Sequence, residues 1–506
     1  MVFSSLEFVL CFLPLVVLAT WAARRLGGAR AVIALLVVAS FAFYAYWDWR
    51  FLPLLLLSIA ANHFCARQLI LRETRRRPLL IAGIAGNLVA LGFFKYFNFF
   101  VQNLEFVAGR DWGFASVVLP IGISFFTFQQ IAYLVDVYNE RQHRYALIDY
   151  ALFVSFFPQL IAGPIVHHKE IMPQLQRADL GRFDPALISS GVVIFVFGLS
   201  KKVLIADTFA SYSDPFYAAA AAGVVLSALD AWAAAGAYGL QLYFDFSGYA
   251  DMAIGLGLIF GIRLPENFDR PYAATSIREF WQRWHITLSR FLRNYLYIPL
   301  GGSRVAAPRM LANLMITMIL GGIWHGAGWT FLLWGLLHGS YLVTQRLFEQ
   351  LRDRFGLPLL PRPVAWGLTM AAVFFAWVPF RADGLEATLV IWQAMLLAGP
   401  ILPERLVEFA GQVGAGPLLA LFGITGGGPN HLWAPDWLTL LSLMVACMAL
   451  AMLLPNGHRV ATVVLGDDTP AWSVARGRLA GASTAVLLVA VLLYLTYEPV
   501  FLYFQF

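Results

Sequence analysis

The chain has 506 residues, of which 60% are hydrophobic and only 13% are charged. Soluble globular proteins usually have about 25% charged residues, so the composition excludes that class and indicates an integral membrane protein. The net charge of +6 is carried by short loops, which favours a topological role for the basic residues over nucleic-acid binding. The three cysteines lie in apolar segments without metal-ligand spacing, so they predict neither disulfides nor a metal site: Cys11, Cys65 and Cys447.

Apolar runs recur along the whole sequence and predict an all-α, polytopic membrane protein that forms one bundle. We expect about eleven membrane-spanning helices. Several runs are shorter than one crossing, and those at 51–66, 146–165 and 249–262 are also broken by Pro or Gly, which predicts that some of them are re-entrant or half-buried helices. The complete set of runs is 5–22, 31–47, 51–66, 79–100, 115–137, 146–165, 185–200, 223–244, 249–262, 310–326, 329–347, 365–380, 387–402, 435–454 and 480–497.

The first run predicts a retained membrane helix rather than a secretory signal. The residues before Phe8 include Glu7 and no Lys or Arg, whereas Arg24 and Arg25 follow the run. A signal peptide has its basic cluster first.

Basic residues gather in every second loop of the first half. Cytoplasmic loops are enriched in Lys and Arg, so this alternation predicts an N-terminus outside the cytoplasm. The clusters comprise Arg24, Arg25 and Arg30, then Arg67, Arg72, Arg75, Arg76 and Arg77, then Arg141 and Arg144.

The segment between Arg263 and Arg309 is too charged to cross lipid and too aromatic to be a free loop. Its apolar residues recur at helical spacing opposite three arginines, which predicts one amphipathic helix at the membrane interface or beneath the bundle. The guanidinium groups can hold the phosphates of an acyl carrier, or equally serve as snorkelling interfacial cations. The apolar residues are Phe280, Trp284, Leu288, Phe291, Leu292 and Tyr295, and the arginines are Arg283, Arg290 and Arg293.

His325 is the candidate general base. It closes an apolar run in the sequence GGIWHGAGW, where glycines let backbone or substrate approach the imidazole closely. The alternative is a histidine that only hydrogen-bonds a neighbouring helix, a role that we expect for His338. His285 is the second candidate, beside the three arginines.

The other polar residues of interest predict structural roles. His167 and His168 form a polar turn at the cytoplasmic mouth rather than a metal site, since the sequence near them shows no third ligand. Asp245 and Asp251 orient a histidine or cap a broken helix. No motif indicates a nucleophilic triad, a nucleotide-binding loop or a metal centre. We expect His63, His431 and His458 to be structural.

Several motifs make the sequence similar to a known family. The stretches LPENFDRPYAATSIREFWQRWHITLSRFLRNYLYIPLGGSR, GGIWHGAGWTFLLWGLLHG and MVFSSLEFVLCFLPL resemble the membrane-bound O-acyltransferase superfamily, and more narrowly its alginate O-acetyltransferase branch. The likeness covers nearly the whole chain. It implies a single domain over residues 1–506, with a catalytic core at about 120–345 and C-terminal helices in 365–506.

The resemblance implies a ring-like bundle of membrane helices, with re-entrant and interfacial helices, around a central tunnel in a bacterial inner membrane. His325 matches the family's catalytic histidine, and His285 matches an upstream position where many relatives carry Asn. The implied donor is cytosolic acetyl-CoA, bound without a metal. The implied partner is a periplasmic SGNH-hydrolase-like acetyltransferase that modifies an exported polysaccharide such as alginate, alongside the polymer's synthesis and export machinery.

The last six residues, FLYFQF, carry four aromatic rings and no charge. Pro499 is disfavoured in a helix interior, so we expect the chain to turn there and the aromatic tail to fold into a hydrophobic groove. The tail then acts as an anchor, or it brings the Tyr503 phenol to His325. In the second case, Tyr503 carries the acetyl group between acetyl-CoA and the partner.

Competing functions remain open at this level. Many spans with buried His and Asp also suit a proton-coupled transporter or flippase, or a scaffold for an export complex. Within the enzyme class, the transferred group and acceptor can instead be acetyl to cellulose or D-alanine to teichoic acid.

Overall fold

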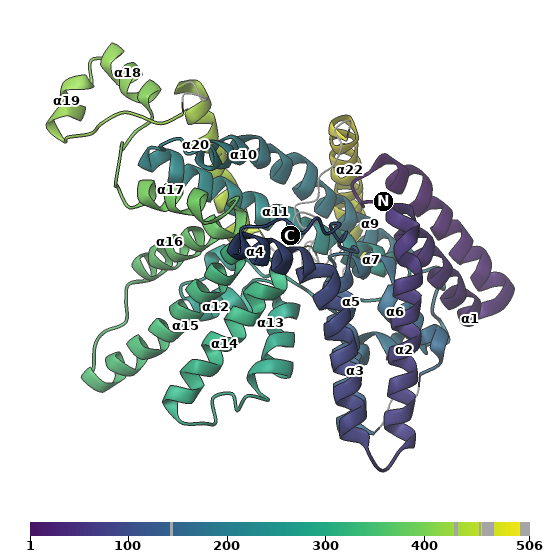
Figure 1. The fold of residues 1–506 in the computed structure, drawn as a ribbon. Coiled ribbons are helices and arrows are strands. Elements are labelled where there is room, and N and C mark those ends of the chain that lie inside the picture. Colours follow the sequence, from purple (N-terminus) through teal and green to yellow (C-terminus); the bar gives the residue numbers. More distant parts are fainter. Residues whose placement is uncertain (142–144, 430–433, 455–456, 458–469, 496–506) are drawn as a thin grey trace. The chain divides into compact units, whose positions relative to one another are not determined.

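The computed structural model describes residues 1–141, 145–429, 434–454, 457 and 470–495, and these form helices joined by mostly short connections (Figure 1). No named β-strand occurs among them, and one isolated bridge pairs Leu402 with Gly426. The expected all-α class is therefore confirmed. Contacts divide the described chain into two units, one built from residues 1–203, 246–267 and the described part after 456, the other from residues 204–245 and the described part of 268–455.

Within the described part of the chain, six helical stretches are long and apolar enough to cross a membrane. The chain is thus a multi-pass membrane protein. The first stretch alone has 65 residues, several times the length of one crossing, so six is not a count of spans. The expected number of about eleven stays a prediction. The stretches are Glu7–Leu71, Arg76–Ala108, Pro185–Ala221, Ala307–His325, Arg362–Arg381 and Asp436–Leu453.

The first unit begins with a long helical stretch that changes direction at Gly28. This glycine has φ +69° and ψ −159° inside α1, a conformation that residues with a Cβ rarely adopt. The elements of the first unit are η1 (Glu7–Phe12), α1 (Leu13–Asp48), η2 (Trp49–Phe51), α2 (Leu52–Leu71), α3 (Arg76–Leu91), η3 (Gly92–Tyr96), α4 (Phe97–Ala108), α5 (Ile123–Glu140), α6 (Leu147–Ser155), α7 (Phe157–Leu160), α8 (His168–Leu175), α9 (Pro185–Ser200) and α22 (Pro470–Tyr494).

The second unit holds the remaining helices. Helix α11 contributes residues to both units, and η4 (Lys201–Ala206) lies at the boundary in sequence. The elements are α10 (Asp207–Ala221), α11 (Ala228–Ile259), η5 (Pro271–Ala273), α12 (Ile277–Arg283), α13 (Ile286–Leu292), η6 (Arg293–Tyr297), α14 (Ala307–His325), α15 (Trp329–Phe355), α16 (Arg362–Arg381), α17 (Leu385–Met395), α18 (Glu404–Gln412), α19 (Gly416–Leu421) and α20 (Ala434–Leu453).

The three runs expected to be broken behave differently. The run at 146–165 is broken, because α6 ends at Ser155 and α7 begins after Phe156. The run at 51–66 is not, because its Pro53 falls in the first turn of α2, where the missing N–H costs nothing. The prediction of a separate element at 249–262 is also wrong, because most of this run belongs to the 32-residue helix α11.

Helices α9 and α11 approach each other through two glycine pairs. A Cβ on Gly198 would lie 2.5 Å from the Gly248 carbonyl oxygen, and one on Gly255 would lie 2.5 Å from that of Gly191. In a membrane protein, small residues at such crossings let backbones pack closely where no hydrophobic driving force helps. Beside this crossing, Lys201 donates to Asp251 at 2.6 Å, with both side chains more than nine-tenths buried.

This crossing yields a stability prediction. We expect Gly198→Ala to lower the free energy of unfolding by about 1–3 kcal/mol, because the added methyl must displace the α11 backbone. Gly86→Ala on α3 is the matched control, since a Cβ there meets nothing within 4 Å. Thermal unfolding in detergent measures both, and equal midpoints for the two variants would contradict the tight crossing.

Candidate active site

Helices α14 and α15 form an antiparallel hairpin that fixes the position of His325. A Cβ on Gly322 would lie 2.4 Å from the Phe331 carbonyl oxygen, and one on Gly335 would lie 2.6 Å from that of Met318. A Cβ on Gly326 would overlap the Phe331 ring. The space beside Gly322 and Gly326 is therefore filled by α15. These two glycines let the backbones of α14 and α15 approach each other and leave no room there for substrate.

His325 is the last residue of α14 and is only 6% exposed. Aromatic rings surround its imidazole: the centroids of Trp324, Trp334 and Phe380 lie 4.9, 5.0 and 5.2 Å away. This wall keeps the imidazole out of bulk water at the point where the helix ends and the chain turns.

His285 lies in a strained turn between α12 and α13. Its backbone adopts φ +44° and ψ +54°, the left-handed region that costs a residue with a Cβ about 1–2 kcal/mol. Its side chain is fully buried, and the Phe268 ring stacks 6.4 Å away. Strained residues of this kind persist where the surrounding structure holds them, often at functional sites.

The structure brings the two candidate histidines together. The ring centroids of His285 and His325 lie 6.5 Å apart, although 40 positions separate them in sequence. His285 lies outside the candidate membrane spans. Burial lowers its pKa to about 3, so its imidazole stays neutral at physiological pH. The pair therefore offers two buried imidazoles, whose ring nitrogens can accept or donate hydrogen bonds.

His338 supports the wall of this site. Its Nδ1 accepts a hydrogen bond from the Trp281 indole at 3.3 Å, and its ring centroid lies 4.8 Å from that of Trp334. Trp334 in turn contacts His325. The expectation that His338 hydrogen-bonds a neighbouring helix is confirmed.

The prediction of a single amphipathic helix through residues 280–295 is wrong. The chain instead forms α12, the turn at Trp284 and His285, α13 and the π-helix η6. Burial of Trp284 explains the break, because its ring stacks on Phe280 at 5.6 Å and contacts Trp377 at 5.0 Å. Side-chain burial here overrides the local preference for a continuous helix.

A cavity of about 510 Å³ lies between these short helices and the α14–α15 hairpin. Trp281 forms part of its wall and packs against Trp334, which also contacts His325. His325 itself is not among the residues that line the cavity. Its remaining lining is largely apolar, with three arginines: Arg278, Arg293 and Arg346.

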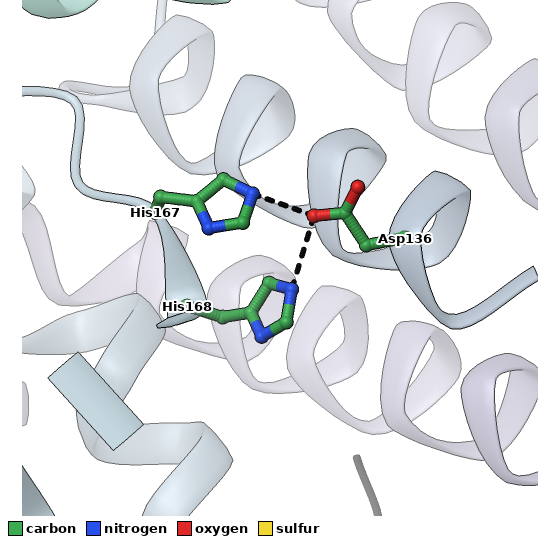
Figure 2. Close-up of side chains that lie close together, drawn as sticks. All are labelled: Asp136, His167 and His168. Atoms are coloured by element: carbon green, nitrogen blue, oxygen red, sulfur yellow. Dashed lines mark hydrogen bonds and ion pairs between the residues drawn. The ribbon is translucent and has the colours of Figure 1, made fainter. Parts of the chain in front are cut away.

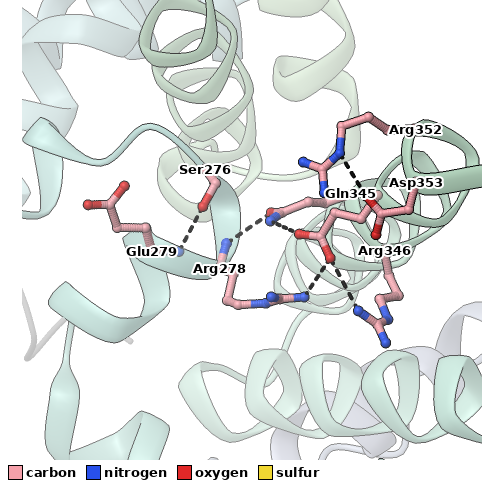
Figure 3. Close-up of polar contacts among 8 residues, drawn as sticks. Ser276, Arg278, Glu279, Gln345, Arg346, Arg352 and Asp353 are labelled. Carbon is pink, nitrogen blue, oxygen red and sulfur yellow. Dashed lines mark hydrogen bonds and ion pairs between the residues drawn. The ribbon is translucent and has the colours of Figure 1, made fainter. Parts of the chain in front are cut away.

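Two of these arginines are held by one carboxylate. Glu349 accepts from Arg278 at 3.0 Å and from Arg346 at 3.3 Å, and the neighbouring Gln345 accepts from the Arg278 backbone N–H (Figure 3). One negative charge between two positive ones leaves the cavity with a net positive lining, to which Arg293 adds. Arg278 and Arg346 were not singled out from the sequence, because only the packing of α12 on α15 brings them together.

The sequence-predicted arginines are placed differently from one another. Arg293 lines the cavity, whereas Arg283 donates to Glu279 at 2.7 Å and to the Asp269 carbonyl at 3.5 Å. Arg290 is half-buried and is not part of the cavity lining. Phosphate binding by Arg283, Arg290 and Arg293 stays a prediction, and the geometry favours Arg293.

The remaining sequence candidates are an ion-paired aspartate, two other polar residues within the described chain, and several residues outside it. Asp251 does not cap a helix, since it lies in the middle of α11 and pairs with Lys201. Asp245 is buried on α11, and the His63 ring packs 5.5 Å from that of Tyr150. Tyr503 and the rest of the aromatic tail, with His431 and His458, lie outside the described residues.

His167 and His168 do have a third polar partner, which corrects the sequence-based expectation. Both rings point at the carboxylate of Asp136 on α5 (Figure 2). Because 31 positions separate Asp136 from His167, spacing alone gave no sign of this cluster.

Comparison with known proteins decides the family. The model of MBOAT, the membrane-bound O-acyltransferase family, matches residues 30–379. The chain belongs to the membrane-bound O-acyltransferase family. It is accordingly an O-acyltransferase, and His325 and His285 lie within the matched region.

Individual members of the family are similar over most of their length. The chain is 45% identical over 388 residues to a peptidoglycan O-acetyltransferase of Helicobacter pylori, covering 71% of this chain and 73% of that protein. It is 41% identical over 412 residues to the "Probable alginate O-acetylase AlgI" of Pseudomonas aeruginosa, covering 79% and 75%. A teichoic acid D-alanyltransferase of Streptococcus thermophilus is 27% identical over 264 residues, covering 49% and 64%.

The buried state of His285 predicts a pH dependence of stability. A histidine in the unfolded chain has a pKa of about 6.5, whereas burial lowers that of His285 to about 3. Between these values the unfolded state binds more protons, so acidification destabilises the fold. From pH 7 to pH 5, we expect the wild type to lose about 2 kcal/mol more stability than His285→Gln. Thermal unfolding across this range measures the difference, and parallel pH profiles would contradict it.

Proposed function

We propose that this membrane-bound O-acyltransferase transfers an acetyl group from acetyl-CoA towards the O-acetylation of an exported polysaccharide. The observation that carries the proposal is the pairing of His325 and His285, both buried and 6.5 Å apart, in a chain of this family. A thioester is already activated, so the protein needs only to position a hydroxyl and accept its proton.

In this proposal, His325 is the general base. The acceptor oxygen forms a bond to the thioester carbonyl carbon while its proton passes to the His325 imidazole. The carbon–sulfur bond then breaks, and the proton returns to the departing CoA sulfur. The aromatic wall around His325 excludes water that would otherwise hydrolyse the thioester.

His285 has a different proposed part. Its depressed pKa makes it a poor carrier of positive charge, so it acts as a neutral hydrogen-bonding group that orients the reacting atoms.

The arginine-lined cavity is the proposed donor site. Guanidinium groups bind phosphate oxygens in bidentate fashion. Glu349 pairs with Arg278 and Arg346, and Arg293 is the third arginine of the cavity lining. His325 is not among the lining residues, which suits a long carrier whose reactive group lies far from its phosphates.

The acceptor polymer follows from the relatives. We propose alginate first, from the similarity to alginate O-acetylases, and peptidoglycan as the second candidate, from the 45% identical relative. A polymer is too large to enter a helical bundle. We therefore propose an acetyl relay through a periplasmic SGNH-hydrolase-like partner, in an inner membrane with the N-terminus of this chain outside the cytoplasm.

The assignment of His325 is tested by substitution. Removing a general base typically lowers the rate about 10²–10⁴-fold, so His325→Ala should abolish acetyl transfer while the protein remains in the membrane at a normal level. Labelled acetyl-CoA supplied to proteoliposomes measures the reaction. Normal turnover in this variant would overturn the role of His325, and solute uptake without consumption of acetyl-CoA would favour a transporter.

The donor site is tested by a pair of arginine variants. Arg293→Gln should raise the KM for acetyl-CoA about tenfold with little change in kcat, because a charge-assisted contact to phosphate is lost. The difference should shrink at high salt. Arg283→Gln is the control that removes the same charge outside the cavity lining. An unchanged KM for Arg293→Gln would place the phosphates elsewhere.

The relay role of Tyr503 is tested by removing one oxygen. In the relay, the phenol oxygen bonds the acetyl carbon as CoA departs with a proton, and the partner's serine then takes the acetyl group. Tyr503→Phe should abolish polymer acetylation, whereas Phe506→Leu should be tolerated. Normal acetylation by Tyr503→Phe would show that the tail is only an anchor.

A further inference from the structure

Asp136, His167 and His168 form a compact polar cluster in the first unit, outside the proposed active site (Figure 2). Asp136 lies near the end of α5, and the two histidines open α8. The Asp136 Oδ2 atom lies 2.5 Å from Nε2 of His167 and 3.0 Å from Nε2 of His168. The family's acyl transfer, as proposed above, does not use these residues.

The backbone explains why consecutive histidines face the same way. His167 is the N-cap of α8 with extended backbone, φ −87° and ψ +140°, and His168 is the first helical residue. The change of conformation between them aims both Nε2 atoms at one oxygen. The His168 side chain is fully buried, while Asp136 and His167 are 13% and 23% exposed, so the cluster is held on one side and accessible on the other.

We propose that this cluster binds a divalent transition-metal ion, with Zn²⁺ as the best match. Two imidazole nitrogens and a carboxylate oxygen are a common zinc donor set, and the three ligand atoms lie within 4.8 Å of one another. Ligand atoms on a tetrahedral zinc ion lie roughly 3.3 Å apart, so small movements of the side chains admit the ion. A water molecule on the side of His167 completes the coordination.

One hydrogen bond competes with the metal. The Lys169 backbone N–H donates to Nδ1 of His167 at 3.2 Å, which places the ring proton on Nε2. Metal binding at Nε2 moves that proton to Nδ1, so this N-cap bond is lost. Loss of a cap bond costs about a factor of ten in an equilibrium constant, whereas structural zinc sites reach association constants on the order of 10⁷ M⁻¹ or more. Metal binding therefore outweighs the cap.

The surroundings suit a structural clamp. The rings of Tyr133 and Tyr145 pack 5.2 and 6.1 Å from that of His168 and fix its orientation. Lys169 is paired with Glu140, one helical turn beyond Asp136, which offsets the charge of this lysine. The bound ion fastens the start of α8 to the end of α5.

Metal analysis of the full-length protein in detergent tests the proposal. After dialysis against EDTA and readdition of Zn²⁺, we expect roughly one equivalent of zinc per chain by elemental analysis. Zn²⁺ should also raise the unfolding temperature of the wild type, as any ligand of the native state does. Asp136→Asn and His168→Gln should lose both effects, and His63→Gln, which changes another buried histidine of the same unit, should keep them.

The wild-type titration decides the matter even if the cluster variants fold poorly. A wild type that retains no zinc and whose unfolding temperature is unchanged by Zn²⁺ would overturn the proposal, leaving a hydrogen-bonded link between α5 and α8. Retention of zinc by Asp136→Asn and His168→Gln at the wild-type level would also overturn it, because the metal would then be bound elsewhere.

Discussion

Backbone-to-backbone contact between helices, made possible by glycine, is the constraint on which the described architecture depends. In the first unit, Gly198 and Gly248 let α9 cross α11, and in the second, Gly322 and Gly335 let α14 lie against α15. At each crossing a single methyl group would overlap a carbonyl oxygen. Since lipid offers helices no hydrophobic reason to associate, this close packing supplies much of what holds them together.

The same contact determines the chemistry of the candidate active site. The α14–α15 hairpin ends one helix at His325 and places Trp334 against its imidazole, and α16 adds Phe380. The left-handed turn at His285 places a second imidazole beside it. Backbone strain at His285 is offset by burial of the neighbouring Trp284, so the turn and the aromatic wall stabilise each other.

Two kinds of polar organisation occur in the chain. The proposed active site keeps two buried imidazoles among aromatic rings, which suits proton transfer sheltered from bulk water. The arginine-lined cavity instead carries charge, partly compensated by Glu349. Because neither His325 nor His285 lines this cavity, an anionic carrier can bind there without placing its phosphates against the reacting imidazole.

The sequence by itself determined the all-α membrane class, since apolar length and charge depletion are local properties. It also pointed to His325, because the flanking glycines and the family motif are contiguous in the chain. Tertiary packing alone decided the left-handed turn at His285, the meeting of Arg278 with Arg346, and the convergence of His167 and His168 on Asp136. Each of these joins segments distant in sequence or overrides a helical pattern through side-chain burial, and neither effect is encoded in residue spacing.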